Sequence, residues 1–440
     1  MKTSLAHVAR LLLVAALTVL SQCGTPWAQA VSPPPIDEKW LPKPALPAPA
    51  QPTVQREVCT PLAVGTRPAG TPVAPVDPGL PQAWQLTRGA AQRIAVIDTG
   101  VSRHPRLPDV IAGGDYVFTG DGTQDCDAHG TLVAGIIAAA PDSKADGVTG
   151  VAPDAALISV RQSSAKFGPL NDRSTTGVGD VDTMAKAVRT AADLGASVIN
   201  ISSVACVPAA SALDDRALGA ALAYAVDVKN AVVVAPAGNT GGAASCPPQR
   251  PDPTWETITV AVSPAWYDDY VLTVGSINTE GKPSPFSLAG PWVDVAAVGE
   301  GVVSLDSAPL SGTSYAAPVV SGLAALIRSR FPDLTARQVM QRIEATAHHP
   351  RAGRDPFVGN GTIDALAAVS TGAVPQAPQA GLTKPKDVSP PKPAPQRSPD
   401  HHARNIAFGG AAVCLAALIA GAAPRLLRSG RANHDGVPGD

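Results

Sequence analysis

The feature that most constrains the fold of this 440-residue chain is a series of short apolar runs that alternate with segments of helical spacing. Runs such as Ile94-Ala95-Val96-Ile97 are apolar on both faces, as strands inside a parallel sheet must be. The alternation predicts an α/β domain whose mostly parallel sheet is covered by helices on both faces. The predicted strands are 93–97, 156–160, 198–202, 231–235, 270–274 and 293–296, and the predicted helices are 131–140, 181–194, 212–228, 316–328 and 335–347.

The composition suits one large folded domain with extensions. Apolar residues make up 45% of the chain, charged residues 16%, and the net charge is −2. A nucleic-acid-binding protein needs a basic surface, which this charge balance does not favour, so we expect no nucleic-acid partner.

The first thirty residues have the pattern of an export signal. A basic start is followed by the apolar run 11–20 and by the small-residue cleavage site Ala28-Gln29-Ala30. The alternative is a signal anchor that stays in the membrane, which the short apolar run disfavours. We therefore interpret 1–30 as a signal peptide and expect Cys23 to be removed with it.

A second apolar stretch lies near the other end of the chain. Residues 406–423 contain no charge and, as a helix, would reach roughly 27 Å, enough to cross a hydrocarbon core. Arg425, Arg428 and Arg431 follow, and positive charge marks the cytoplasmic side of a span. This predicts a single transmembrane helix at 405–424, a cytoplasmic tail at 425–440 and an extracytoplasmic location for the residues between the signal and the span. A buried helix of a soluble domain is the alternative, disfavoured by the proline-rich stretch upstream.

Proline divides the exported part into three segments. Residues 31–81 are crowded with proline and are predicted to be extended, either free or laid over a surface. Cys59 lies within this extension and favours attachment. The folded domain is predicted at 82–372, and a second proline-rich segment, 373–404, reads as a linker to the membrane.

Three motifs supply an acid, a base and a nucleophile. Asp98 ends a predicted strand in Asp-Thr-Gly, His129 begins a helical run in His-Gly-Thr-Leu-Val-Ala-Gly, and Ser314 lies in Gly-Thr-Ser-Tyr-Ala-Ala-Pro. Taken singly, they could be a turn aspartate and two helix-capping residues. Together, their order and local structure match one of the known arrangements of the Ser-His-Asp triad.

A fourth motif offers a donor for an oxyanion. Asn239 follows a predicted strand and a glycine in Ala-Pro-Ala-Gly-Asn, so its amide can point into the same site. The alternative is a turn asparagine, a common use of Gly-Asn.

These four motifs resemble the signatures of the subtilases, over about residues 80–370. The further layout of signal, proline-rich extension, tether and C-terminal span resembles that of the mycosins, membrane-anchored subtilases of type VII secretion. The resemblance implies a subtilisin-like fold, serine endopeptidase activity on exported proteins or peptides, and the type VII membrane complex as partner. It implies no cofactor. It also implies an alternative role as a structural component of that complex, with proteolysis secondary.

The sequence departs from the subtilase pattern after the strand 198–202. Subtilases usually continue with Ser-Leu-Gly-Gly, whereas this chain has Ser202-Ser203-Val204-Ala205-Cys206. We therefore expect weak or narrow activity on generic substrates.

Four cysteines remain in the exported part: Cys59, Cys126, Cys206 and Cys246. In an oxidising compartment they should form two disulfides, for which three connectivities are possible. We favour Cys59–Cys126, which would attach the extension beside the His129 loop, and Cys206–Cys246, which would join two loops beside the cleft. A metal site is the alternative, but neither a CxxC spacing nor a nearby histidine pair supports one.

Overall fold

The computed structural model describes residues 31–62, 75–141, 147–174, 177–211, 213–242, 245–305 and 308–371. The chain divides into a unit of residues 1–376 and a unit of residues 377–440, and the described residues all belong to the first. The predicted signal, linker, span and tail lie outside the described residues. Within the described ranges, no helix is both long and apolar enough to cross a membrane.

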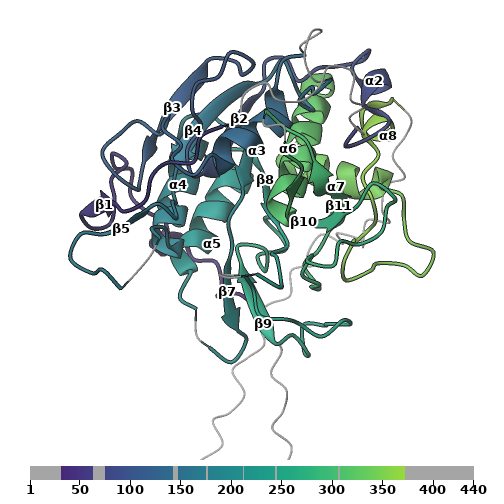
Figure 1. The fold of residues 1–440 in the computed structure, drawn as a ribbon. Helices are drawn as coiled ribbons and strands as arrows, with labels where there is room; N and C mark the ends of the chain where they lie inside the picture. Colours follow the sequence, from purple (N-terminus) through teal and green to yellow (C-terminus); the bar gives the residue numbers. More distant parts are fainter. Residues whose placement is uncertain are drawn as a thin grey trace, which may run out of the picture. The chain divides into compact units, whose positions relative to one another are not determined.

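A seven-stranded sheet forms the centre of the domain (Figure 1). Every neighbouring pair in it is parallel, so the predicted parallel sheet is confirmed. In spatial order the strands are β11 (Val295–Val298), β10 (Leu272–Ile277), β8 (Val232–Pro236), β6 (Val198–Ile201), β2 (Arg93–Asp98), β4 (Ala156–Arg161) and β3 (Val110–Asp115).

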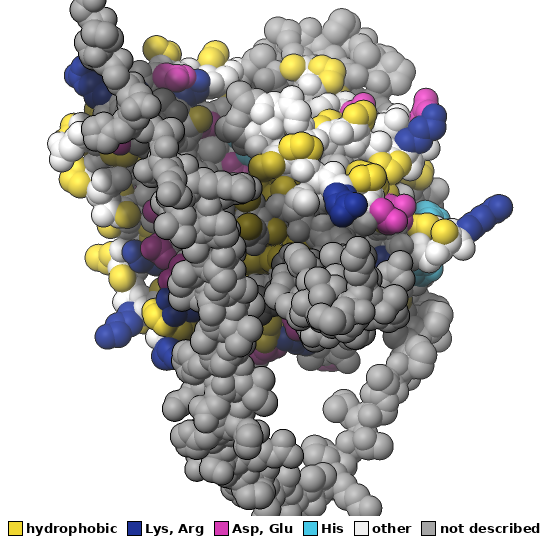
Figure 2. Space-filling view, turned by 90° about the horizontal axis from the view of Figure 1, so that it is seen from below, with side chains coloured by type: hydrophobic (Ala, Val, Ile, Leu, Met, Phe, Trp, Pro, Cys, Tyr) yellow, Lys and Arg dark blue, Asp and Glu magenta, His cyan; other side chains and the backbone are white. Residues whose placement is uncertain are grey.

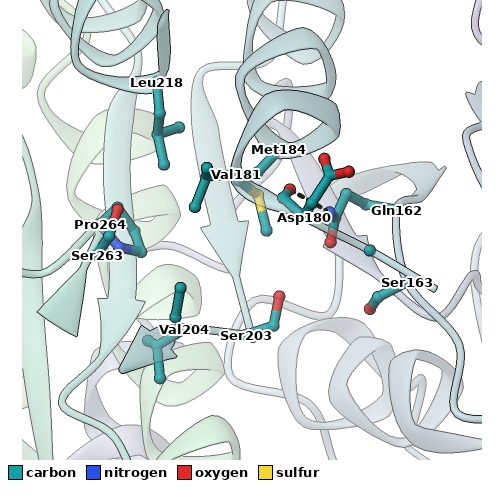
Figure 3. A pocket seen from close by; sticks show the side chains of 12 residues that line it. Gln162, Ser163, Asp180, Val181, Met184, Ser203, Val204, Leu218, Ser263 and Pro264 are labelled. Atoms are coloured by element: carbon teal, nitrogen blue, oxygen red, sulfur yellow. Dashed lines mark hydrogen bonds between the residues drawn. The ribbon is translucent and has the colours of Figure 1, made fainter. Parts of the chain in front are cut away.

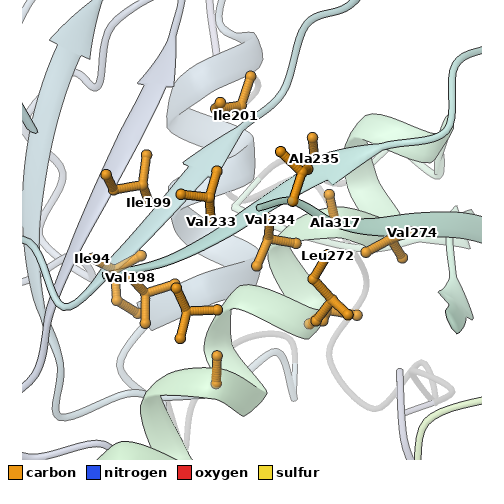
Figure 4. Packing of buried hydrophobic residues seen from close by; sticks show 14 of the residues in the cluster. Ile94, Val198, Ile199, Ile201, Val233, Val234, Ala235, Leu272, Val274 and Ala317 are labelled. Atoms are coloured by element: carbon orange, nitrogen blue, oxygen red, sulfur yellow. The ribbon is translucent and has the colours of Figure 1, made fainter. Parts of the chain in front are cut away.

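Two pairs of helices cover this sheet. Helices α3 (His129–Ala138) and α6 (Thr313–Arg330) pack together on one face, and α4 (Val181–Asp193) and α5 (Arg216–Ala223) pack together on the other. The strands are therefore buried on both sides, which is why their apolar runs are uninterrupted. Figure 4 shows part of this core, where Val234, Leu272 and Ala317 lie close together. Burial of each such Val or Leu side chain contributes about 1.5–3 kcal/mol.

Several boundaries differ from the sequence prediction. Helix α6 begins at Thr313 instead of 316, so Pro318 lies in its second turn, where it removes a single backbone hydrogen bond. Helix α5 begins at Arg216 instead of 212, since the side chain of Asp215 is buried and accepts bonds from Ser263, Trp266 and Tyr267. A π-helical turn, Tyr224–Val228, completes the predicted helix.

Four strand pairings were not predicted. Besides the edge strand β3, the structure contains the two-stranded sheets β1–β5, β7–β9 and β12–β13. Their bounds are β1 (Thr53–Gln55), β5 (Phe167–Pro169), β7 (Ala205–Pro208), β9 (Val260–Ser263), β12 (Glu300–Val302) and β13 (Leu310–Ser311). The strands of the three two-stranded sheets have only two to four residues, and β3 contains two glycines and two exposed positions, so none of them has a clear strand pattern.

The described part of the proline-rich extension lies on the surface of the domain. The sequence analysis left this arrangement open beside a free extension. Its strand β1 pairs with β5, Glu57 forms an ion pair of 2.8 Å with Lys166, and Arg216 stacks 3.8 Å from the ring centroid of Trp40. Trp40 belongs to a short 3₁₀ helix, η1 (Glu38–Trp40). The extension is thus held at several points.

The remaining helices close the domain. Helix α2 (Leu80–Ala83) spans the boundary that we predicted between 81 and 82. Helix α7 (Ala336–Thr346) starts with a capping box formed by Thr335 and Gln338, and α8 (Ala365–Val369) follows. On the face seen in Figure 2, the visible Lys and Arg side chains are scattered among acidic ones.

Candidate active site

Three elements bring the predicted triad residues to one place. Asp98 is the last residue of β2, His129 is the first of α3, and Ser314 is the second of α6. The carboxyl ends of parallel strands are where open α/β sheets bind their ligands. Residues 31 and 185 positions apart in sequence therefore meet here.

The side chains form a continuous hydrogen-bonded series. His129 Nδ1 lies 2.8 Å from Asp98 Oδ1 and 3.0 Å from Oδ2, and His129 Nε2 lies 3.0 Å from Ser314 Oγ. An ionised carboxylate only accepts, so Nδ1 carries the proton and donates it to Asp98. The lone pair of Nε2 then faces the Ser314 hydroxyl. The imidazole can therefore take the hydroxyl proton as a general base.

Burial and charge shift the pKa values of Asp98 and His129. Asp98 is 2% exposed and the His129 side chain 28%. Burial acts to raise the pKa of Asp98, but the charge and hydrogen bond of His129 outweigh it, and the pKa lies below its ordinary value. Burial acts to lower the pKa of His129, but Asp98 outweighs it, and the pKa lies above its ordinary value. The pair thus favours an imidazolium beside a carboxylate.

Asn239 lies beside Ser314 with a fixed orientation. Its Oδ1 accepts hydrogen bonds of 2.9 Å from both the backbone N–H and the hydroxyl of Thr313. Because these donors fix the oxygen, the Nδ2 amide group is turned away from Thr313. The N–H groups in the first turn of a helix have no partner within the helix. Asn239 Nδ2 and the backbone N–H of Ser314 are therefore the candidate donors for an oxyanion here.

A disulfide supports this asparagine. Cys206 and Cys246 are bonded, and the N–H of Cys246 donates to the carbonyl of Asn239 at 2.8 Å. The second disulfide joins Cys59 to Cys126 in the loop before His129. These are the two pairs that the sequence analysis favoured.

The residues around Ser314 form an open cleft of about 410 Å³. Its walls come from the triad motifs, from the segment after β6 and from the Cys206–Cys246 disulfide. His129 is the one titratable residue among those that line it, which are His129, Ser202, Val204, Cys206, Pro236, Gly238, Asn239, Ser245, Cys246, Thr313 and Ser314.

The comparison with known families agrees with this site. The model of the subtilase family matches residues 89–364. The chain belongs to the subtilases. It is 67% identical to mycosin-4 of Mycobacterium tuberculosis, with 98% of each chain covered, and 44% identical to mycosin-3 of the same organism, with 91% of this chain and 93% of mycosin-3 covered. Within the subtilases it therefore belongs to the mycosins, and it is a subtilisin-like serine protease.

Solved structures show the same fold. The MycP3 protease from the type VII (ESX-3) secretion system is 44% identical, with a TM-score of 0.70, and covers 78% of this chain and 100% of its own. A chain in the intact ESX-5 inner membrane complex is 39% identical, with a TM-score of 0.72, and covers 90% of this chain and 100% of its own.

Two further residues of this subtilase lie next to the predicted triad, one in direct contact with His129 and one connected to it through threonines, and the sequence analysis missed both. Tyr315 places its ring 5.0 Å from that of His129, centroid to centroid. Asp125 hydrogen bonds to Thr131 and Thr99, which flank His129 and Asp98. The aspartate in Asp125-Cys126-Asp127-Ala128-His129 was the available signal, but nothing local indicates that it turns toward the threonines.

A smaller hollow of about 120 Å³ adjoins the cleft of the subtilase (Figure 3). It lies between the segment after β4, with Gln162 and Ser163, and the segment after β6, with Ser203 and Val204. Val204 lines both hollows. Gln162 is held by a hydrogen bond of 3.0 Å to the carbonyl of Asp180.

Proposed function

We propose that this subtilase is a membrane-anchored endopeptidase that works with a type VII secretion complex and hydrolyses peptide bonds of exported proteins. Asp98, His129 and Ser314 are its triad, and Asn239 is its oxyanion donor. The observation that carries the proposal is the series from Asp98 through His129 to Ser314, with contacts of 2.8 and 3.0 Å.

The mechanism follows from this geometry. Ser314 Oγ attacks the scissile carbonyl carbon while His129 Nε2 takes its proton, and Asp98 stabilises the imidazolium. Asn239 and the N–H of Ser314 bind the oxygen on which negative charge develops. His129 then gives the proton to the leaving amine, which departs and leaves an ester on Ser314. Water, deprotonated by His129, hydrolyses that ester and restores the hydroxyl.

The peptide would bind in an extended form between the segments 162–163 and 203–205, beside the hollow of Figure 3. The second segment runs directly into β7, whose backbone pairs with β9. This pairing with β9 restricts the backbone conformations of the segment, which is the one that usually binds substrate in subtilases. It supports the expectation of slow or narrow cleavage of generic peptides.

The placement at the membrane rests on sequence and similarity. Similar chains occur in the intact ESX-5 inner membrane complex and in its periplasmic assembly, the second with 40% identity and a TM-score of 0.70. The signal 1–30 and the span 405–424 would put the domain 82–372 outside the membrane, on the linker 373–404, with 425–440 inside. Both features support a catalytic domain in a periplasm-like space.

Ser314→Ala tests the catalytic assignment. A fluorophosphonate probe should label the wild-type chain at Ser314 and leave S314A unlabelled, because the reagent needs an activated hydroxyl. Ser174, an exposed serine that hydrogen bonds to Asp172, provides the control, and S174A should be labelled like the wild type. Equal labelling of S314A and wild type would contradict the proposed triad.

The second candidate function is structural support of the secretion complex. The observation that favours it is the extension, which is held on the domain by β1, by a disulfide and by the stacking of Trp40. S314A separates the two roles in cells. If secretion and complex assembly persist in S314A cells while cleavage stops, structural support dominates; if secretion stops, proteolysis is the main role.

A further inference from the structure

Asp125 is a partly buried carboxylate that the triad mechanism does not use. Its Oδ2 accepts hydrogen bonds from the backbone N–H of Thr131 at 2.8 Å and from the Thr131 hydroxyl at 2.7 Å. Its Oδ1 accepts from the Thr99 hydroxyl at 2.8 Å and from the N–H of Asp127 at 3.1 Å. Four donors therefore converge on one side chain.

These bonds provide the cap that helix α3 otherwise lacks. The residue before the helix is Ala128, which has a φ of 66° and no side-chain acceptor. The first N–H groups of a helix need an acceptor from outside it. Thr99 Oγ1 accepts from the N–H of Gly130 at 3.0 Å, and Asp125 accepts from that of Thr131. The N–H groups of Gly130 and Thr131 at the start of α3 are thus bound by Thr99, which follows β2, and by Asp125 in the loop.

The same network joins both partners of the Asp–His pair. His129 is the first residue of α3, so a fixed helix start fixes its position. Thr99 follows Asp98, and its N–H donates to Asp98 Oδ1 at 2.7 Å. Through Thr99 and Thr131, Asp125 therefore acts on the relative placement of Asp98 and His129 without touching the hydroxyl of Ser314.

Asp125 also contributes charge at this place. The acidic groups that act on His129 are Asp98 from β2 and Asp125 and Asp127 from the loop, and α6 contributes the neutral Tyr315. Burial raises the pKa of Asp125 to about 6, against the effect of its hydrogen bonds to Thr131, so it is ionised at neutral pH. After Asp98, it is the next group that raises the pKa of His129.

We propose that Asp125 is a positioning residue of the hydrolytic reaction, which caps α3 so that His129 faces Ser314 and whose negative charge stabilises the imidazolium formed in the transition state. The inference rests on the proposed function of the triad. An ordinary helix cap would stabilise the fold and leave the proton affinity of His129 unchanged. The proposed role of Asp125 differs, because its charge increases that proton affinity.

Asp125→Asn tests the charge while it keeps the shape of the side chain. Removal of the negative charge lowers the pKa of His129, so a weaker base takes the Ser314 proton. In the full-length chain in detergent, kcat should fall by roughly tenfold or more, part of the 10²–10⁴ that a general base contributes. The acid limb of kcat/KM should move to lower pH, because activity needs the neutral imidazole, and the imidazole NMR titration of His129 should move in the same direction.

Asp121 offers a matched control. It too accepts from the N–H and the hydroxyl of one threonine, Thr123, at 2.9 and 2.6 Å, but it is exposed and does not act on His129. D121N should retain the wild-type kcat and acid limb. If D125N keeps the wild-type acid limb and the wild-type titration of His129, Asp125 is only a helix cap and the proposal is wrong.

Thr99 provides a second pair of variants should D125N not fold. T99V removes the hydroxyl that links Asp125 to Gly130, whereas T99S keeps it. The kcat of T99S should exceed that of T99V by about tenfold. Equal values would overturn the positioning role. The two proposals can fail separately. If the wild type is inactive and is not labelled by the fluorophosphonate, the proposed triad is wrong. The NMR titration of His129 does not depend on turnover, so it measures the effect of Asp125 on His129 in either case.

Discussion

A single side chain carries half of the proposed oxyanion site. Asn239→Ala removes the Nδ2 donor but leaves the triad and the N–H of Ser314 in place. Because the donor acts on charge that develops only in the transition state, kcat should fall by about 10²–10³ while KM changes little. Steady-state kinetics on a peptide that the wild type cleaves would measure both constants.

Asn278 serves as the matched residue for this test. It also lies in a turn, where its side-chain oxygen accepts from the backbone N–H groups of Glu280 and Lys282, but it is not among the residues that line the cleft. N278A should leave kcat at the wild-type value. A loss in N239A that appears mainly in KM would show that Asn239 binds substrate instead of stabilising the oxyanion.

Among single residues, the sequence predicts those that lie in a recognisable local motif. Asp98, His129, Ser314 and Asn239 each lie at or near the end of a strand or the start of a helix, beside small residues, so their placement could be predicted. Asp125 could not, because its role depends on contacts with Thr99, 26 positions away. An aspartate four residues before a histidine is otherwise compatible with any polar loop.

Among the elements, the loop that carries Asn239 depends most on a covalent link. Cys206→Ser with Cys246→Ser opens a closure of 40 residues, which the chain-entropy model values at about 4 kcal/mol of unfolding free energy. It also loosens the loop whose Cys246 N–H donates to the Asn239 carbonyl. We expect both lower stability in urea and a lower kcat per folded molecule.

Removal of the other disulfide distinguishes the effect on stability from the effect on kcat. Cys59→Ser with Cys126→Ser opens a closure of 67 residues and should cost a similar free energy, about 4 kcal/mol. It leaves the Asn239 loop intact, so kcat should fall less than in the first pair. Equal losses of kcat in the two double variants would argue against a specific support of Asn239.

The elements that the sequence predicts best are those with strong periodicity. Buried strands such as β2 and β4 and the capped helix α7 were found because their patterns are long or chemically specific. The edge strand β3 was missed since Val110–Asp115 contains two glycines and two exposed positions. The β7–β9 pair was missed because only the folded chain brings Ala205 beside Ser263.

For the molecule as a whole, the open question is whether the extension inhibits the enzyme or forms part of it. None of the residues that line the cleft beside Ser314 belongs to 31–62. The extension instead covers the surface around β5 and α5, where β1, Glu57 and Trp40 make their contacts. This arrangement supports a structural role and argues against a propeptide that blocks the cleft.

Deletion of residues 31–62, combined with Cys126→Ser to avoid a free thiol, tests this role. The free energy of unfolding should fall by at least the roughly 4 kcal/mol of the lost disulfide. The kcat per active site, counted by fluorophosphonate titration, should stay near that of the C59S/C126S variant, which keeps the extension but lacks the bond. A severalfold rise in kcat after deletion would instead identify an inhibitory propeptide, since removal of a segment that only stabilises the fold cannot accelerate turnover at sites already counted as active.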